Sequence, residues 1–482
     1  MNFFTSRSKK QVALSIVLFL TTTFSAFSQD LIIGFRQTSR ANSMEVLKKI
    51  HAKQARMIVP SLGIAQVRFD RGFSRSDASQ ILRTLSSDPA VKYAFFDLRV
   101  VRERTVYTPD STNRAQEDYF STKQWNLREG NPVSTHAERV WKEFKVQSRT
   151  WQQKEVVAAI IDGGFDLKHP NLAKAIWVNK GEIPGNGKDD DGNGYVDDVN
   201  GWNVYNNSGK IPVEMHGTHV AGIIGAMPTA ERKIYGIYPS VKVMTVAGSS
   251  GNLSTVLKAY GYVLKQKQLY ISSQGKLGAN VVVVNSSFGV DGANCASDQY
   301  KAWNEIYNEM GKYGIINVAA TTNNDDNVDV VGDVPTGCDS PYLLSVGRLY
   351  QDGHIEGGYG KTTVDLHAPG GDIFSTVPGN SVRPLTGTSM ATPHVTGAVA
   401  YLFWLMESAV PLNTKDRIQK APLYVKSTLM NAVNQFPNMA GKTVTGGSLD
   451  LYKAARLITG KLEANGVRAE SVVRRQVPLR SI

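Results

Sequence analysis

The chain has 482 residues, of which 41% are apolar and 20% charged, a composition typical of a soluble globular protein with material for a large core. No internal repeat or low-complexity segment is visible, which argues against a repeat array or a disordered chain. The formal charge is +12, but basic residues are spread along the chain without a nucleic-acid-binding motif, so we expect no nucleic-acid partner.

The first 28 residues have the pattern of a secretory signal peptide. Three basic residues precede an apolar run over residues 12–20, and Ala26 and Ser28 are the small residues of a cleavage site before Gln29. The alternative is a membrane anchor, but the run is shorter than the roughly 20 residues that span a bilayer. We therefore expect a secreted protein, extracellular or periplasmic, without a stable membrane anchor.

Residues 29–104 form a predicted small α+β unit. Strand-like and helix-like stretches alternate within it, at residues 30–36, 44–53, 63–69, 74–87 and 90–96. The order strand, helix, one or two strands, helix, strand predicts a ferredoxin-like fold. The polar and basic segment 99–113 predicts an exposed stretch, and residues 105–118 are the predicted linker to a larger domain.

The larger domain is predicted to cover residues 119–460. Runs that are apolar throughout are separated by helical stretches, and they lie at residues 156–161, 241–246, 281–285, 314–320 and 343–346. Strands of this kind are typical of a parallel sheet that is covered by helices on both faces. We therefore expect a three-layer α/β domain, followed by a loose basic tail over residues 461–482.

The first of these strands ends in a carboxylate, because Asp162 follows residues 156–161 and precedes two glycines. Open α/β sheets bind ligands at the carboxyl ends of their strands, where a carboxylate can hold the tautomer of a catalytic histidine. An Asp that only begins a turn would look the same by itself.

His216 is a candidate general base, since neutral imidazole takes up and returns a proton near pH 7. The alternatives are a buried structural histidine and a metal pair formed with His219. The metal pair lacks the Glu of a zinc-protease helix, because Gly217 follows His216.

Ser389 is a candidate nucleophile within the glycine-bounded segment 387–397. It lies at the start of an apolar helix, where free backbone N–H groups can stabilise an oxyanion. Pro393 is expected in the first turn of that helix, where its missing N–H costs little. By itself, Thr388 followed by Ser389 would indicate only a helix cap.

Together these segments resemble the Asp, His and Ser motifs of the subtilase family, over about residues 156–397. The order Asp–His–Ser is that of subtilisin, whereas chymotrypsin-like enzymes and α/β-hydrolases use other orders. The resemblance implies a subtilisin-like domain and a serine endopeptidase that acts on proteins or peptides, with Asp162, His216 and Ser389 as its triad. It also implies that residues 29–104 are an inhibitory prodomain, which blocks the cleft of its own chain until it is cut.

The family places an oxyanion-binding Asn after an apolar strand that ends in Ala-Ala-Gly-Asn. Residues 314–323 align with that motif without a gap, so the resemblance implies Asn323, with Asn324 as the alternative by adjacency. Thr322 departs from the usual Gly. Because Thr is bulkier and stiffer, we expect the local backbone or pocket to differ.

The resemblance further implies a cleft that holds the substrate as an extended strand. Its predicted edges are Ser286, Ser287, Phe288 and Gly289 on one side, and Gly248 and Gly251 on the other. Phe288 could instead be a core residue.

An acidic loop at residues 188–198 predicts a structural Ca²⁺ site. Its candidate ligands are Asp189, Asp191, Asn193, Tyr195, Asp197 and Asp198. Asp189, Asp191 and Asn193 stand at alternate positions and can converge on one cation, although the distant Glu of an EF-hand loop is absent. Many subtilases carry calcium, and the alternative is a solvated acidic turn.

The chain has two cysteines, Cys295 and Cys338. In an exported protein they favour one disulfide over two buried thiols.

Two other function classes stay open. One is a catalytically inactive subtilase-fold binding protein, for which Thr322 is the supporting feature. The other is an exported esterase, which the triad order and the absence of a nucleophile elbow disfavour, since Ala391 stands where that elbow has Gly.

Overall fold

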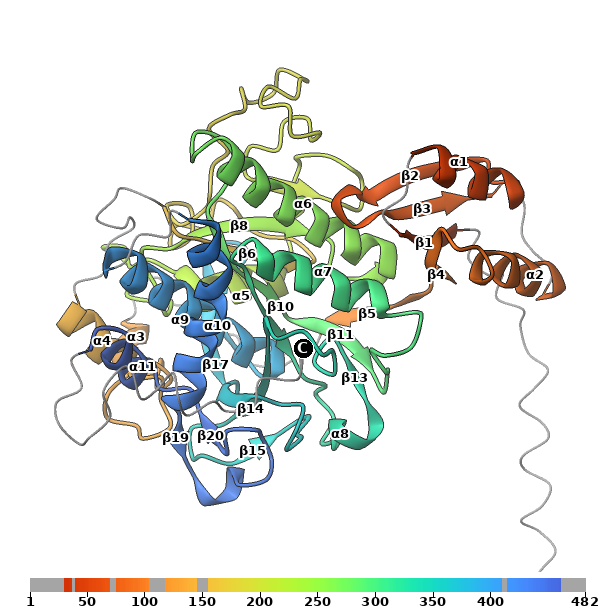
Figure 1. Cartoon of the computed structure of the whole chain (residues 1–482). Helices are drawn as coiled ribbons and strands as arrows, with labels where there is room; N and C mark the ends of the chain where they lie inside the picture. The colour runs from red at the N-terminus through yellow and green to blue at the C-terminus, as the bar shows by residue number, and fades with distance from the viewer. Residues whose placement is uncertain are drawn as a thin grey trace, which may run out of the picture.

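The computed structural model describes residues 30–36, 40–69, 75–103, 118–144, 155–409 and 414–460. A small N-terminal unit lies beside a larger domain that begins at residue 118 (Figure 1). The predicted signal peptide, the linker up to residue 117 and the basic tail lie outside the described residues. Among the helices that are described, none is both long enough and apolar enough to cross a bilayer.

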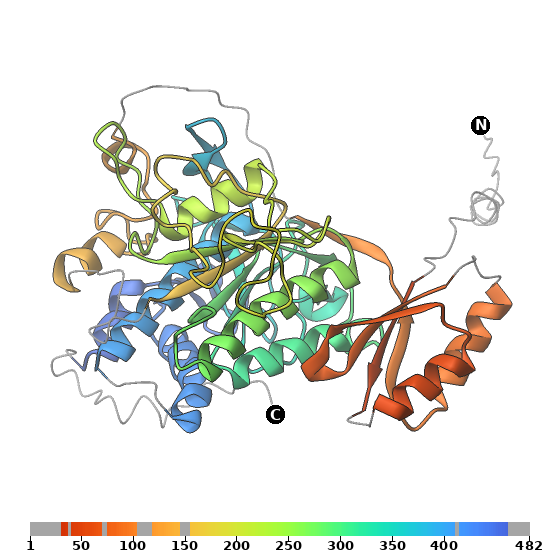
Figure 2. The same ribbon diagram turned by 90° about the horizontal axis from the view of Figure 1, so that it is seen from above.

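The small unit is an antiparallel sheet in the order β2-β3-β1-β4, with both helices on one face (Figure 2). Its elements are β1 (Asp30–Phe35), α1 (Arg40–Lys49), β2 (Gln54–Val59), η1 (Pro60–Leu62), β3 (Ile64–Arg68), α2 (Arg75–Ser86) and β4 (Val91–Phe96). Side chains alternate along β1, so that Leu31 and Ile33 pack against the helices while Ile32 faces the larger domain. The predicted ferredoxin-like unit is confirmed, although its first helix begins at Arg40 rather than at residue 44.

The first five residues of the segment 99–113, which the sequence predicts to be an exposed stretch, are part of a sheet. They form β5 (Arg99–Glu103), which pairs with β9 (Gly251–Asn252) on one side and β11 (Phe288–Asp291) on the other. Main-chain groups make this pairing, and two free strand edges of the larger domain provide the partners. The polarity of the segment therefore gave no sign of it.

A mostly parallel sheet forms the centre of the larger domain, in the order β19-β20-β16-β14-β12-β10-β6-β8-β7. Its strands are β6 (Val157–Asp162), β7 (Gly201–Asn203), β8 (Lys242–Ala247), β10 (Val281–Ser286), β12 (Ile316–Ala320), β14 (Leu343–Leu349), β16 (Leu366–Pro369), β19 (Asn434–Gln435) and β20 (Gly447–Ser448), with β15 (Ile355–Glu356) beside β14. Every neighbouring pair from β7 to β16 is parallel, as the uniformly apolar strands predicted.

Helices cover both faces of this sheet (Figure 1). Along β6, Val157 and Ala159 pack with α6 (Leu253–Ser272) and α7 (Lys301–Lys312), while Ala158 faces the opposite layer. That layer contains α4 (Ala137–Phe144), α5 (Met215–Gly225), α9 (Thr388–Ala409), α10 (Lys415–Asn431) and α11 (Leu451–Ile458). The remaining elements are α3 (Tyr119–Thr122), α8 (Val328–Val331), β13 (Asp333–Val334), β17 (Ile373–Val377), β18 (Ser381–Leu385) and η2 (Pro437–Met439). The three-layer α/β prediction is confirmed.

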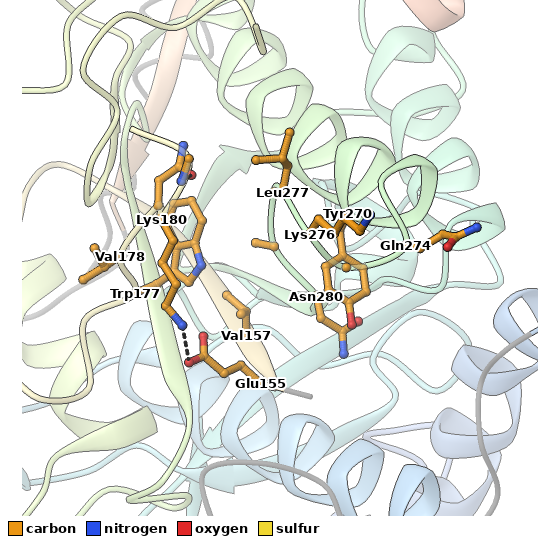
Figure 3. Close-up of a pocket in the computed structure, with 15 residues that line it drawn as sticks. Glu155, Val157, Trp177, Val178, Lys180, Tyr270, Gln274, Lys276, Leu277 and Asn280 are labelled. Atoms are coloured by element: carbon orange, nitrogen blue, oxygen red, sulfur yellow. Dashed lines mark hydrogen bonds and ion pairs between the residues drawn. The ribbon is translucent and has the colours of Figure 1, made fainter. Parts of the chain in front are cut away.

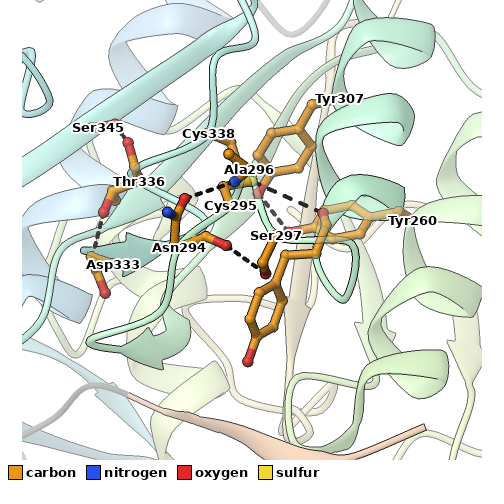
Figure 4. The surroundings of a disulfide bond; sticks show 11 residues. Tyr260, Asn294, Cys295, Ala296, Ser297, Tyr307, Asp333, Thr336, Cys338 and Ser345 are labelled. Atoms are coloured by element: carbon orange, nitrogen blue, oxygen red, sulfur yellow. Dashed lines mark hydrogen bonds between the residues drawn. A yellow bond between two sulfur atoms is a disulfide. The ribbon is translucent and has the colours of Figure 1, made fainter. Parts of the chain in front are cut away.

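The disulfide that the two cysteines favoured is present (Figure 4). Cys295 and Cys338 join the loop after β11 to the loop after β13, and both are buried. The bond therefore links two segments beside the strand that pairs with β5.

Candidate active site

Asp162 and His216 form a buried pair at the carboxyl end of β6. Asp162 is the last residue of that strand, and its Oδ1 accepts a hydrogen bond from the backbone N–H of Gly163 at 2.8 Å. His216, in the first turn of α5, has its Nδ1 at 2.9 and 3.0 Å from the two carboxylate oxygens. Burial raises the pKa of the Asp162 carboxyl, and the charge and hydrogen bonds of His216 oppose that rise. A proton held on Nδ1 leaves Nε2 as the basic nitrogen.

Gly217 explains why α5 can approach β6 so closely. A Cβ at this position would lie 2.2 Å from the carbonyl oxygen of Gly164 and 3.0 Å from the Cβ of Asp162. A larger residue would push the helix, and His216 with it, away from the carboxylate.

Ser389 is the second residue of α9, which packs against α5 on the same face of the sheet. Its Oγ donates to the carbonyl oxygen of Ser287 at 3.0 Å, and the Ser287 hydroxyl donates back to the carbonyl oxygen of Ser389 at 2.9 Å. Ser287 directly follows β10, so these bonds fix the nucleophile candidate to the same sheet edge as Asp162.

The expected place of Pro393 in the first turn of α9 is wrong, because it is the sixth residue of the helix. A proline there cannot donate the usual hydrogen bond to the carbonyl oxygen of Ser389. The Ser287 hydroxyl makes that bond instead. The helix thus remains continuous while Ser389 stays tied to β10.

Asn323 follows β12, and its side chain turns toward the start of α9. Its Oδ1 accepts hydrogen bonds from the backbone N–H of Thr388 at 3.0 Å and from Arg348 Nη1 at 3.3 Å. Donors around Oδ1 identify the amide oxygen, so Nδ2 faces away from them, and no described residue accepts a bond from it. Asn324, the alternative, is exposed and lacks these contacts.

Thr322 is accommodated by a glycine on a neighbouring loop. Thr322 is buried, and a Cβ at Gly358 would lie only 2.9 Å from its Cγ2. The backbone N–H of Gly358 donates to the Thr322 carbonyl oxygen at 2.8 Å. The Thr322 side chain therefore fits because the residue beside it is a glycine, which has no Cβ.

The predicted cleft edge at 286–289 contributes main chain rather than side chains. Phe288 pairs with Glu103 of β5, but its ring is buried at 6.1 Å from the ring centroid of Trp303. The Ser286 hydroxyl is likewise buried, at 2.7 Å from the hydroxyl of Tyr260. These two side chains therefore belong to the core.

On the opposite predicted edge, Gly251 pairs with Val101 of β5. Gly248 instead donates its backbone N–H to the carbonyl oxygen of Asp162 at 2.8 Å. It supports the end of β6.

The small unit contacts the larger domain beyond β5. Asp97, which is fully buried, accepts hydrogen bonds from the backbone N–H of Ser254 at 2.9 Å and from its hydroxyl at 2.5 Å. These groups lie in the first turn of α6, whose N-cap residue Asn252 makes no side-chain cap of its own. Glu305 of α7 accepts from Lys92 Nζ at 2.7 Å.

The acidic loop brings three carboxylates together. One oxygen from each of Glu182, Asp189 and Asp191 lies within 4.8 Å of the others. Burial, aided by the charge of Asp191, raises the pKa of Glu182. Three converging carboxylates suit a hard cation such as Ca²⁺, so the donor set fits the expected ion. The sequence reasoning missed Glu182 because it precedes the Asp-rich run by several residues.

Other predicted ligands point elsewhere. Asp198 is fully buried, and burial raises its pKa to about 7. Its carboxylate accepts hydrogen bonds from the side chains of Asn179, Asn193, Tyr262 and Gln266. Asp197 accepts from the backbone N–H groups of Gly185 and Gly187, and the Tyr195 ring packs edge-on against Trp202.

A pocket of about 390 Å³ lies at the opposite edge of the sheet (Figure 3). Trp177, Tyr270 and Asn280 are among its lining residues, and its wall contains the Lys180–Glu155 ion pair at 3.3 Å. Asn280 precedes β10 at its amino end, whereas the candidate catalytic residues lie at the carboxyl ends. This pocket is therefore separate from the candidate active site.

Known proteins with similar sequences include subtilisin-like proteases and a serine proteinase. Subtilisin-like protease 1 of Plasmodium vivax is 30% identical over 330 residues, which are 65% of this chain and 49% of that protein. The thermophilic serine proteinase of Bacillus sp. strain AK1 is 27% identical over 367 residues, 73% of this chain and 75% of that protein. The chain thus spans about half the length of the Plasmodium relative.

Solved structures support the same fold. Fervidolysin from Fervidobacterium pennivorans matches with a TM-score of 0.61 at 20% identity, over 90% of this chain and 62% of that one. The epidermin leader peptide processing serine protease of Staphylococcus aureus matches with a TM-score of 0.61 at 17% identity, over 89% and 98%. The model of the Subtilase family matches residues 153–448. The chain therefore belongs to the subtilase family of serine proteases.

Proposed function

We propose that this chain is a secreted serine endopeptidase that cuts proteins through an acyl-enzyme intermediate. The observation that carries the proposal is the buried Asp162–His216 pair, with Nδ1 at 2.9 Å from the carboxylate, whose helix α5 packs against the helix that has Ser389 in its first turn. His216 Nε2 removes the proton of Ser389 Oγ, which then attacks a peptide carbonyl. His216 returns that proton to the leaving amine, and water then hydrolyses the ester.

Asn323 and the start of α9 stabilise the oxyanion in this proposal. The amide Nδ2 is available as a donor, and the backbone N–H of Ser389 is among the first four of its helix. Removal of one such donor typically lowers turnover by about 10²–10³-fold. Thr322, the feature that suggested an inactive protein, is accommodated by Gly358 and gives that alternative no further support.

We also propose that residues 29–104 act as an inhibitory prodomain. Support comes from β5, which lies as an extended strand between β9 and β11 at the two predicted edges of the cleft, and from the cap that Asp97 gives to α6. Glu103 is opposite Phe288 in the pairing of β5 with β11. If the strand continues in this register, the carbonyl of the next residue lies opposite Ser287, whose own carbonyl oxygen accepts the hydrogen bond of Ser389 Oγ. The proposed cut therefore follows Arg104, which lies outside the described residues.

A Ca²⁺ ion held by Glu182, Asp189 and Asp191 is proposed to stabilise the acidic loop. An ion there would neutralise carboxylates that otherwise repel one another, and it takes no part in the reaction. Export rests on the signal-peptide pattern of residues 1–28.

The test is hydrolysis of casein by the purified chain beside Ser389→Ala and His216→Ala. Ser272→Ala, which changes an exposed serine of α6, is the matched control. We expect activity in the parent and control, and a loss of at least about 10³-fold in the other two. Full activity of Ser389→Ala would refute the proposal.

A further inference from the structure

Arg348 is a buried cation beside the proposed oxyanion-binding amide. It lies on β14 and is only 4% exposed. Its Nη1 donates to Asn323 Oδ1 at 3.3 Å, and its Nη2 donates to Glu356 Oε2 at 2.5 Å. The guanidinium therefore spans the distance between the active-site amide and a carboxylate on β15.

Counting protons shows that Arg348 is one of two firm donors to Asn323 Oδ1. The Thr388 hydroxyl is 3.1 Å from that oxygen but only 2.6 Å from the Thr321 carbonyl oxygen. Its single proton serves the shorter bond. The backbone N–H of Thr388 and the guanidinium of Arg348 then remain, and they match the two lone pairs of an amide oxygen.

The far end of Arg348 is anchored. Arg348 and Glu356 are directly opposed in the antiparallel pair β14–β15, and the Tyr350 hydroxyl also donates to Glu356 Oε2, at 2.7 Å. The Tyr350 hydrogen bond, together with the charge of Arg348, lowers the pKa of Glu356, so Glu356 remains an anion at neutral pH. Gly370 leaves room for the arginine, because a Cβ there would lie 2.6 Å from Arg348 Cβ.

Burying a guanidinium is expensive, and among the described residues Arg348 Nε has no hydrogen-bond partner. The guanidinium is thus held by hydrogen bonds from Nη1 and Nη2, while its Nε–H is left without one in the described part of the chain. A site that only needed to fill this space could do so with an apolar side chain of the same volume.

We propose that Arg348 is a positioning residue for Asn323. It fixes the amide so that Nδ2, rather than Oδ1, faces the oxyanion, and its charge polarises the amide and strengthens the Nδ2–H donor. The inference rests on the proposed role of Asn323. Because Arg348 acts through Asn323, its loss should cost less than the 10²–10³-fold expected for the amide itself, about tenfold in kcat. KM should hardly change, since the contact matters only when negative charge develops on the substrate oxygen.

The experiment measures kcat and KM on a peptide p-nitroanilide for the parent, Arg348→Met, Asn323→Ala and the double variant. Arg232→Met is the matched control, because Arg232 is also a buried arginine that donates to an Asn side chain, at 2.7 Å from Asn380 Oδ1. We expect Arg348→Met to lower kcat about tenfold in the parent and less than twofold in the Asn323→Ala background. The affinity for a peptide aldehyde, which forms a tetrahedral adduct, should fall with kcat. Arg232→Met should change neither quantity.

An equal loss of kcat in both backgrounds would overturn the inference, because Arg348 would then act independently of Asn323. An unchanged kcat in Arg348→Met would also overturn it. So would an Asn323→Ala variant as active as the parent while Ser389→Ala is inactive, although the proposed protease function would then still stand. An active Ser389→Ala would instead remove the proposed function itself. If Arg348→Met does not fold, Arg348→Lys takes its place in the same comparison of single and double variants. One ammonium cannot contact both Asn323 and Glu356 as the guanidinium does.

Discussion

Replacing Asp97 by alanine should release the prodomain from the mature enzyme. The carboxylate is fully buried and accepts the backbone N–H and the hydroxyl of Ser254 at 2.9 and 2.5 Å. Hydrogen bonds to a charged group contribute about 1.5–3 kcal/mol each, and the cost of burying the carboxylate offsets part of that sum. A net loss of about 2 kcal/mol corresponds to a roughly 30-fold weaker complex.

The assay starts from the processed complex, in which the cut prodomain is still bound. The complex is diluted stepwise, and peptide hydrolysis reports the free enzyme. Asp97→Ala should shift the midpoint of activation to about 30-fold higher concentration. Glu45→Ala is the control, because it removes an exposed carboxylate from α1 of the same unit. If both variants dissociate within twofold of the parent, the capping contact does not hold the prodomain and the reasoning is refuted.

Three further results are expected. The mature enzyme should begin at Thr105, as read by N-terminal sequencing, and a start more than two residues away would contradict the register of β5. An ion present at about 100 times its Kd should stabilise the enzyme by about 2.7 kcal/mol, which for a domain of this size raises the thermal midpoint by about 4 °C. Chelation of the calcium, or Glu182→Gln, should remove that increase, whereas Asp416→Asn should not. Stability should also fall as the pH drops below about 6.5, because burial lowers the pKa of three imidazoles in the folded state, to about 3 for His219 and His367 and to about 4 for His394. The unfolded chain then takes up protons first, and each histidine costs about 2 kcal/mol at pH 5. Equal urea midpoints of Ser389→Ala at pH 7.5 and pH 5 would contradict this prediction.

The sequence predicted the parallel sheet and the position of Asp162 well, for a simple reason. Strands buried on both faces must be apolar throughout, and the first polar residue then marks the functional edge. His216 and Ser389 lie in the first turns of helices that start at this edge, so their motifs also indicated their place.

Main-chain pairing and long-range contacts could not be predicted in this way. β5 is polar and is held by strand edges about 150 and 185 residues further along the chain, so hydropathy gave no signal for it. Glu182 and Arg348 lie outside the sequence motifs, and only the folded chain brings them next to the acidic loop and to Asn323. Phe288 stands within a predicted cleft edge, yet its ring faces the core, because side chains alternate along a strand.

The most direct test of the central claim is covalent labelling by a serine-reactive organophosphonate, followed by peptide mapping of the mature enzyme. The account predicts one modified residue, Ser389, with casein hydrolysis lost in proportion to labelling, and no modification in Asp162→Ala or His216→Ala on the same timescale. Labelling at another serine, with Ser389 unmodified while activity is lost, would contradict it.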